Sequence, residues 1–228
     1  GIEVLPPSVN ESYSQFTVPP RADDKEKHKI RFGLVTIKNF GQGVATAIIE
    51  ERKKSGPFKS LLDFLERVKH KNLNKKSLES LIKAGAVDDF EERGLMLKNL
   101  DKLLAYHKEA SSKAEHQDSL FGIFEDKSIL PTLKLDKSEP INEKEKLSWE
   151  KELLGLYISG HPLMEHSEKL SKAKVTSVNF KDTPEGAEII LAGIIGEVRT
   201  SVTKGGEMMA FVKLEDLNGS VDMVVFPR

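Results

Sequence analysis

Basic side chains gather in one stretch of this chain, and their chemistry suits a phosphate ligand. Between residues 67 and 83 a single acid, Glu79, accompanies six lysines and arginines: Arg67, Lys69, Lys71, Lys75, Lys76 and Lys83. Lys75 and Lys76 fall in the first turn of an expected helix, where the helix dipole disfavours cations and a bound phosphate would relieve them. The stretch therefore predicts a phosphate-binding surface; the alternative is an ordinary solvated face.

A second candidate phosphate site is the segment 38–43, which reads Lys38, Asn39, Phe40, Gly41, Gln42 and Gly43. It resembles the hairpin of a helix-hairpin-helix motif, which is usually Gly-hydrophobic-Gly. Phe40 would then plug the space between two helices, and Gly41 would turn the backbone with a positive φ and let a phosphate approach. The amides that open the next helix would face that phosphate, with the helix dipole behind them.

Asn39 departs from this motif, because it stands where the first glycine is usual. Asparagine tolerates the left-handed backbone region better than most residues, so we expect the turn to be kept. Whether a phosphate comes close at this residue is left open. The alternative for the whole segment is a tight turn between two packed helices, with no contact to DNA.

An apolar pair, Leu120-Phe121, interrupts the polar stretch 108–146, which we expect to be a solvated linker. It closes the sequence Gln117-Asp118-Ser119-Leu120-Phe121. This Gln-x-x-Leu-Phe pattern resembles the motif by which bacterial DNA polymerases and repair proteins dock on the sliding clamp. Leu and Phe would fill an apolar pocket, and Gln would add directed hydrogen bonds. The alternative is that the pair packs back onto the chain itself.

No set of residues in the sequence suggests catalysis or a bound metal. The chain has no His-x-x-x-His pair, and no paired aspartates at alternating strand positions such as a two-metal polymerase site needs. It also has no cysteine, which excludes thiolate ligands and cysteine nucleophiles. We therefore expect no catalytic residue, no metal site and no cofactor here.

Helical elements must position these segments. Helical spacing of apolar residues begins at Val44 and continues towards residue 115. Ser60 and Asn74 stand where N-caps are expected, and Gly85 is placed to end the helix that Asn74 begins. After the polar stretch, Asn142 is expected to cap a further helix.

Residues 188–228 predict a β module. Three segments alternate apolar and polar residues, and Asn218-Gly219 is typical of a two-residue hairpin turn. Three strands cannot close a barrel, so we expect a truncated module whose residues 221–228 pair with another copy or lack order. The side chains that could contact a single nucleic-acid strand are Arg199, Lys204, Phe211 and Lys213.

The composition sets further bounds. The 228 residues carry 35 Lys and Arg against 36 Asp and Glu, a net charge of -1, which excludes a uniformly basic nucleic-acid binder but allows a local patch. No apolar run approaches the roughly 20 residues of a membrane span, and the lack of cysteine fits a cytoplasmic protein. A first residue that is not Met and a last segment inside a strand indicate a fragment.

Taken in order, these features resemble one family, the alpha subunits of bacterial DNA polymerase III, which are replicative C-family polymerases. The resemblance extends along nearly the whole chain. Its most literal stretches are residues 1–10, 30–34, 37–52, 73–89, 117–121, 150–163 and 214–221.

The resemblance implies an α+β fold made of a helical domain with tandem helix-hairpin-helix elements, a linker and an incomplete antiparallel OB-type module. Residues 1–29 would end the fingers region, 30–115 would form the helix-hairpin-helix DNA-binding domain, and 116–146 the linker with the clamp motif. Residues 147–187 would be a helical connector. Residues 188–228 would be the first strands of an OB-fold, a module that in many proteins binds single strands.

The function implied is that of a polymerase fragment that contacts duplex DNA and tethers the polymerase to the sliding clamp for processive synthesis. The expected partners are the clamp, duplex DNA, single-stranded DNA and other holoenzyme subunits, with no membrane. By the same resemblance the catalytic aspartates lie before Gly1, so this part of a DNA-directed DNA polymerase should be inactive alone. The alternatives are a structural spacer without DNA affinity and the helix-hairpin-helix module of a repair enzyme.

Overall fold

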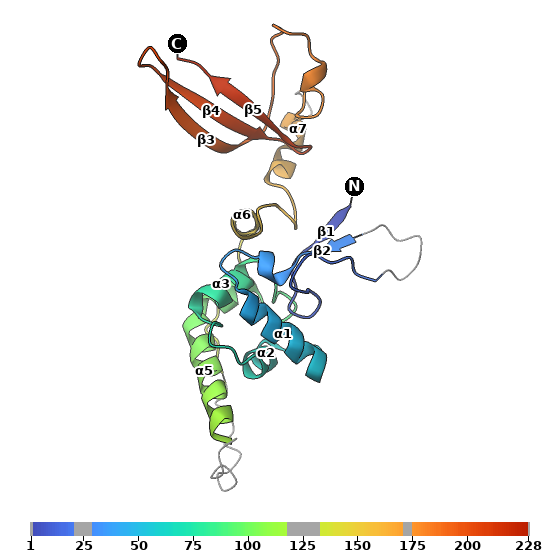
Figure 1. Ribbon diagram of the computed structural model, residues 1–228, viewed down its shortest axis with the longest axis vertical. Coiled ribbons are helices and arrows are strands. Elements are labelled where there is room, and N and C mark those ends of the chain that lie inside the picture. Colours follow the sequence, from blue (N-terminus) through green and yellow to red (C-terminus); the bar gives the residue numbers. More distant parts are fainter. Residues whose placement is uncertain (1, 21–28, 118–132, 171–174, 228) are drawn as a thin grey trace. The chain divides into compact units, whose positions relative to one another are not determined.

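The computed structural model describes residues 2–20, 29–117, 133–170 and 175–227, without the side chains of residues 113–117 and 169 (Figure 1). Its contacts divide the chain into two units, residues 1–159 and 160–228. The first is mainly helical and the second contains a three-stranded antiparallel sheet, so the predicted α+β class is confirmed. No helix in the described ranges is long and apolar enough to cross a membrane.

The first unit begins with two short parallel strands, β1 (Glu3–Leu5) and β2 (Lys29–Arg31). Its helices follow in the order η1 (Leu34–Thr36), α1 (Gln42–Ser55), α2 (Leu61–Arg67), α3 (Lys75–Lys83), α4 (Arg93–Lys98), α5 (Leu100–Gln117) and α6 (Glu143–Leu154).

The predicted helix boundaries rest on side-chain caps that the structure contains. Ser60 Oγ accepts a hydrogen bond from the Asp63 amide at 3.1 Å, and the Asn142 side chain accepts one from Glu145 at 2.8 Å. Asn74 forms a capping box with Ser77 at the start of α3. These caps satisfy amides that the helix itself leaves unpaired, so each confirms the sequence prediction.

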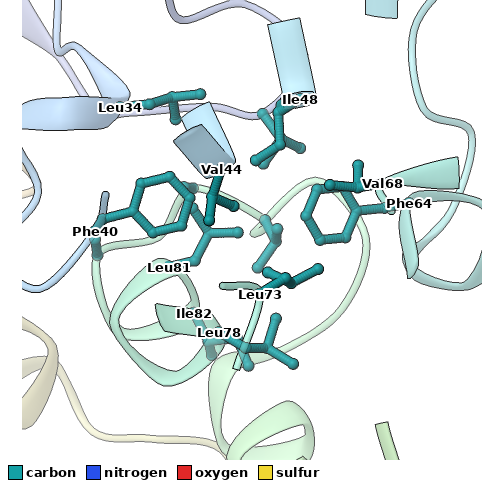
Figure 2. Close-up of a cluster of buried hydrophobic side chains, with 14 of the residues drawn as sticks. Leu34, Phe40, Val44, Ile48, Phe64, Val68, Leu73, Leu78, Leu81 and Ile82 are labelled. Carbon is teal, nitrogen blue, oxygen red and sulfur yellow. The ribbon is translucent and has the colours of Figure 1, made fainter. Parts of the chain in front are cut away.

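The core of this unit lies between α1, α2 and α3. Figure 2 shows Leu34, Phe40, Val44 and Ile48 on one side of this core, facing side chains from α2, α3 and the loop between them. The labelled partners are Phe64, Val68, Leu73, Leu78, Leu81 and Ile82. Phe40 is only 5% exposed and lies beside Val44 and Leu81, so it plugs the space between helices as predicted. Burial of this kind stabilises by about 1.5–3 kcal/mol per large side chain.

Helix α5 is fastened to α2 by two polar contacts. Tyr106 donates its hydroxyl to a Glu66 carboxylate oxygen, and His107 Nδ1 lies 2.8 Å from the Leu65 carbonyl oxygen. Burial, with the hydrogen bond and charge of Glu66, raises the pKa of Tyr106 to about 12. The neutral phenol is therefore the form that the fold prefers.

Residues 133–141 pack against α4 and α5, which differs from the solvated linker that we predicted. Asn99 Nδ2 donates to the Asp136 carbonyl at 2.9 Å, and the Asp136 amide donates back to Asn99 Oδ1 at 2.8 Å. The Ile141 amide donates to Glu92, which also caps α4. Burial tends to raise the pKa of Glu92, but these backbone hydrogen bonds lower it below its usual range. Side chains thus satisfy this segment's backbone although the segment itself is polar.

The second unit contains η2 (Pro162–His166), α7 (Ser167–Leu170), η3 (Phe180–Asp182) and a sheet in the order β3-β4-β5. The strands are β3 (Ile194–Val202), β4 (Met208–Glu215) and β5 (Ser220–Val225). Strand β5 pairs with β4 from Glu215↔Ser220 to Ala210↔Val225. Residues 221–225 therefore form an ordered strand, which differs from the expected lack of order. Pairing of β5 with another copy of the chain stays a prediction.

The turn between β4 and β5 is longer than the Asn-Gly pair predicted. Glu215 pairs with Ser220, so four residues form the turn. Asp216 Oδ1 accepts hydrogen bonds from the amides of Asn218 at 2.8 Å and Gly219 at 2.9 Å. Neither Asn218 nor Gly219 has a positive φ, which a two-residue type I′ turn would need. The side chain of Asp216 therefore organises this hairpin.

Candidate nucleic-acid interface

The first hairpin joins η1 to α1, and its left-handed residue is Asn39. Asn39 has φ 65° and is the one non-glycine residue with a positive φ in the described part of the chain. Gly41, which we expected to turn with a positive φ, is instead extended at φ -88° and ψ 151°. Asn39, which stands in place of the first glycine of the motif, thus supplies the left-handed residue of the turn, and Gly41 does not.

The outer side of this hairpin is open. Phe40 points into the core, whereas Lys38, Asn39 and residues 41–43 are exposed. Gly41 is the N-cap of α1 but offers no side chain to it, and a Cβ built on Gly41 would meet nothing within 4 Å. The first amides of α1 thus lack a capping side chain. This is the arrangement that binds a phosphate at a helix N-terminus.

Asn39 gives a direct test of this backbone geometry. Replacing Asn39 with valine should lower the free energy of unfolding by about 1–2 kcal/mol, because a Cβ-branched residue is strained in the left-handed region. Replacing it with glycine should leave stability unchanged within about 0.5 kcal/mol. Urea denaturation of both variants measures the difference, and equal stability of the two would contradict the assigned backbone conformation.

The loop 69–74 lies against the same end of α1. A Cβ on Gly43 would come within 2.9 Å of His70 Nε2, so glycine is what lets the imidazole approach. His70 Nδ1 accepts a hydrogen bond from the Asn72 amide at 3.2 Å, which assigns the proton of the neutral ring to Nε2, on the side of Gly43. The tertiary fold therefore brings part of the basic stretch beside the hairpin.

Two members of the basic stretch serve the fold itself. Arg67 binds Glu51 at 3.1 Å and Asp63 at 3.0 Å, and its guanidinium lies over the Phe58 ring. Lys83 pairs with Glu79 at 2.7 Å and lies over Trp149. Their charges are thus already used within the helical unit.

The remaining lysines differ in whether their charge is already paired with a carboxylate. Lys75, which we predicted to bind DNA, makes an ion pair with Asp101 at 2.7 Å, although both side chains are exposed. Exposed pairs of this kind contribute about 0–1 kcal/mol, so a phosphate can replace the carboxylate. Among the lysines of the first hairpin and the basic stretch, those that are exposed and form no ion pair with a described residue are Lys38, Lys69, Lys71 and Lys76.

A second hairpin, residues 84–86 between α3 and α4, is closed by the protein. All three residues are buried, and the Ala86 carbonyl accepts a hydrogen bond from the Val9 amide at 2.9 Å. Gly85 has φ 79°, and a Cβ there would lie 2.2 Å from the Arg93 guanidinium. Arg93 fills the place beside this hairpin and also donates to the Lys83 carbonyl at 3.0 Å. A phosphate therefore has access to the first hairpin and not to this one.

Three of the four candidate single-strand residues, Arg199, Phe211 and Lys213, share one face of the sheet. Arg199, Phe211 and Val224 are opposite one another across the three strands, as are Glu197, Lys213 and Asp222. Lys204 lies apart from them, in the turn between β3 and β4.

Acidic residues accompany the cations on this face. Arg199 Nε lies 2.6 Å from Glu197 Oε1, and this contact lowers the pKa of that carboxyl. Asp222 is the neighbour of Lys213 on the adjacent strand. The face therefore presents an aromatic ring, but its cations are balanced by carboxylates.

The clamp-motif residues are placed only in part. Gln117 is the last residue of α5, and Asp118, Ser119, Leu120 and Phe121 lie outside the described residues. Among the described residues, no group of three or more His, Asp or Glu side chains is arranged to hold a metal ion.

Comparison with known proteins places these features in a class and then in a family. The helix-hairpin-helix motif family matches residues 1–95, which lie in the first unit and include both hairpins. The whole chain is 39% identical to the DNA polymerase III subunit alpha of Thermus aquaticus, 38% to that of Aquifex aeolicus and 35% to that of Bacillus subtilis. It belongs to this family, and it spans 18–20% of the length of these three relatives.

Proposed function

We propose that this chain is the part of a replicative DNA polymerase that grips duplex DNA behind the active site and tethers the enzyme to its sliding clamp. The observation that carries the DNA contact is the first hairpin, where the exposed Gly41 precedes a helix that no side chain caps. The exposed lysine Lys38 and the loop that carries Lys69 and Lys71 adjoin it in sequence or in space. Helix amides would bind one phosphate, and the lysines would neutralise its neighbours.

The named relatives are polymerase subunits, which supports DNA synthesis as the activity of the full protein. We propose that this part contributes positioning and not chemistry, since the sequence contains no aspartates paired at alternating strand positions for two-metal catalysis. DNA and the other holoenzyme subunits would be its partners, and the cytoplasm its location. Clamp tethering rests on the Gln117–Phe121 pattern, and processive synthesis would follow from it.

A weaker proposal concerns single strands. Strands β3 to β5 would be the first strands of an OB-fold, and Phe211, which is 48% exposed, would stack on a base. The carboxylates of Glu197 and Asp222 oppose a polyanion at the same face, so duplex contact at the hairpin remains the main proposal.

Placing a carboxylate at the open helix end tests that main proposal. Gly41→Asp should weaken binding to a 30-base-pair duplex roughly tenfold or more, because charge-assisted hydrogen bonds are worth about 1.5–3 kcal/mol. The same variant should be more stable than the parent by roughly a few tenths of a kcal/mol, because aspartate is a better N-cap than glycine. Fluorescence anisotropy gives the affinity, and urea denaturation gives the stability.

Ser60→Asp is the matched control. It changes the net charge equally and keeps a cap, but at the start of α2. It should bind duplex within about twofold of the parent, apart from a small long-range effect of charge. Equal affinity of Gly41→Asp and Ser60→Asp would reject the hairpin as the contact, and a parent chain that binds no duplex at low salt would favour the structural spacer.

A further inference from the structure

A basic hollow lies between the loop 69–75 and helix α5. Its wall holds lysines and histidines from both elements and no acidic side chain; the basic members are Lys69, His70, Lys71, Lys75, His107 and Lys108. Leu73 and Leu104 add an apolar part. An anion would gain from this surplus of positive charge, and the apolar face of a sugar could rest on the leucines.

One polar atom in the wall lacks a partner. Ser111 Oγ is buried, and no described residue forms a hydrogen bond with it. A buried hydroxyl left unpaired destabilises a fold, so such an atom commonly marks a place where a ligand or water binds. Ser111 therefore adds a directed donor to the charge of the lysines.

The hollow adjoins the first hairpin through His70. The imidazole of His70 lines the hollow, and its Nε2 side also lies against Gly43 at the start of α1. A ligand in the hollow and a ligand at the hairpin would thus have one side chain between them. This closeness suits one continuous DNA backbone.

We propose that the hollow binds a second phosphate, with its deoxyribose, on the same DNA strand that the first hairpin contacts. The inference rests on the proposed duplex binding and extends it from one phosphate to two. Lys108 and Ser111 of α5 would hold this phosphate from one side, and Lys69 and Lys71 from the other. A nucleic-acid backbone, unlike a free anion, has a sugar that can contact the apolar part of the hollow.

Ser111→Ala separates binding from folding. It should weaken duplex binding about tenfold, the loss expected for one hydrogen bond to a charged group. It should not lower the melting temperature, and relief of the unpaired hydroxyl should raise it by about 2–4 °C. Ser112→Ala, at the exposed neighbouring position of the same helix, is the matched control and should leave affinity unchanged.

The location of the phosphate is tested with a duplex scanned by single neutral methylphosphonates. The parent should lose affinity when the methylphosphonate lies at either of two sets of positions on one strand. The affinity of Lys108→Ala should not change with a methylphosphonate at one of these sets. The affinity of Gly41→Asp should not change with a methylphosphonate at the other set. Lys108→Ala should also flatten the logarithmic salt dependence by about 0.9, the value for one phosphate.

Three outcomes separate the possibilities. If the parent binds no duplex, the proposed function fails together with this inference. If Gly41→Asp loses binding while Ser111→Ala and Lys108→Ala behave like Ser112→Ala, only the hollow is rejected. If inorganic phosphate alone binds tightly and Ser111→Ala abolishes that binding with duplex affinity intact, the hollow is a site for a free anion and the inference is wrong.

Discussion

Replacing Arg93 with methionine should lower the free energy of unfolding of the helical unit by about 3–5 kcal/mol, the cost typical of breaking a buried ion pair. Arg93 is 5% exposed and makes three contacts of 2.7–3.1 Å to the carboxylate of Asp88. It also lies 3.8 Å from Glu150, which is 2% exposed. Methionine would fill similar space but leave the charge of Glu150 buried without its cation. Urea denaturation followed by circular dichroism measures the change.

Two further variants test whether this loss of stability comes from the buried charge of Glu150. Arg199→Met breaks an exposed ion pair with Glu197 in the other unit and should cost far less, because water already solvates both charges. Adding Glu150→Gln to Arg93→Met should restore part of the stability, because the amide is neutral. A loss with Arg93→Met as small as that with Arg199→Met would show that Arg93 does not hold the second hairpin.

Replacing both Leu120 and Phe121 with alanine should abolish detectable binding to the sliding clamp. The two side chains are expected to contribute about 1.5–3 kcal/mol each on burial, and Gln117 roughly 0.5–1.5 kcal/mol. After the entropy of ordering the peptide, the parent should bind with micromolar affinity, about -8 kcal/mol. Loss of both anchors is then a change of at least about 100-fold. Surface plasmon resonance on immobilised clamp measures it.

The clamp and DNA contacts should be separable. The Leu120 and Phe121 double variant should keep the duplex affinity of the parent, and Gly41→Asp should keep the clamp affinity. Clamp binding should also depend little on salt, because its anchors are apolar, whereas duplex binding falls steeply with salt. If the double variant bound clamp like the parent, the contact would lie elsewhere in the chain. Micromolar affinity is sufficient because DNA threaded through the clamp raises the effective concentration of the motif.

Features that depend on near neighbours in the chain are predictable from the residue types and their spacing. The caps at Ser60, Asn74 and Asn142 were predictable because each binds an amide three residues away. The inward position of Phe40 followed from its place between two expected helices. The β module followed from alternation, since successive side chains of a strand point to opposite faces. Even the left-handed Asn39 was expected, because few other residues tolerate that conformation.

Packing between distant segments determines which of the basic residues are available to a ligand and which hairpin is open. Arg67 and Arg93 look like Lys69 and Lys71 in the sequence, yet the first two are enclosed by carboxylates and carbonyls. From the sequence, residues 133–141 resemble a linker because their partner, Asn99, lies 37 residues before Asp136. The second hairpin is closed by Val9, which is 77 residues before Ala86 in the chain. Such contacts between distant segments depend on how the helices pack, and no local pattern of residue types encodes them.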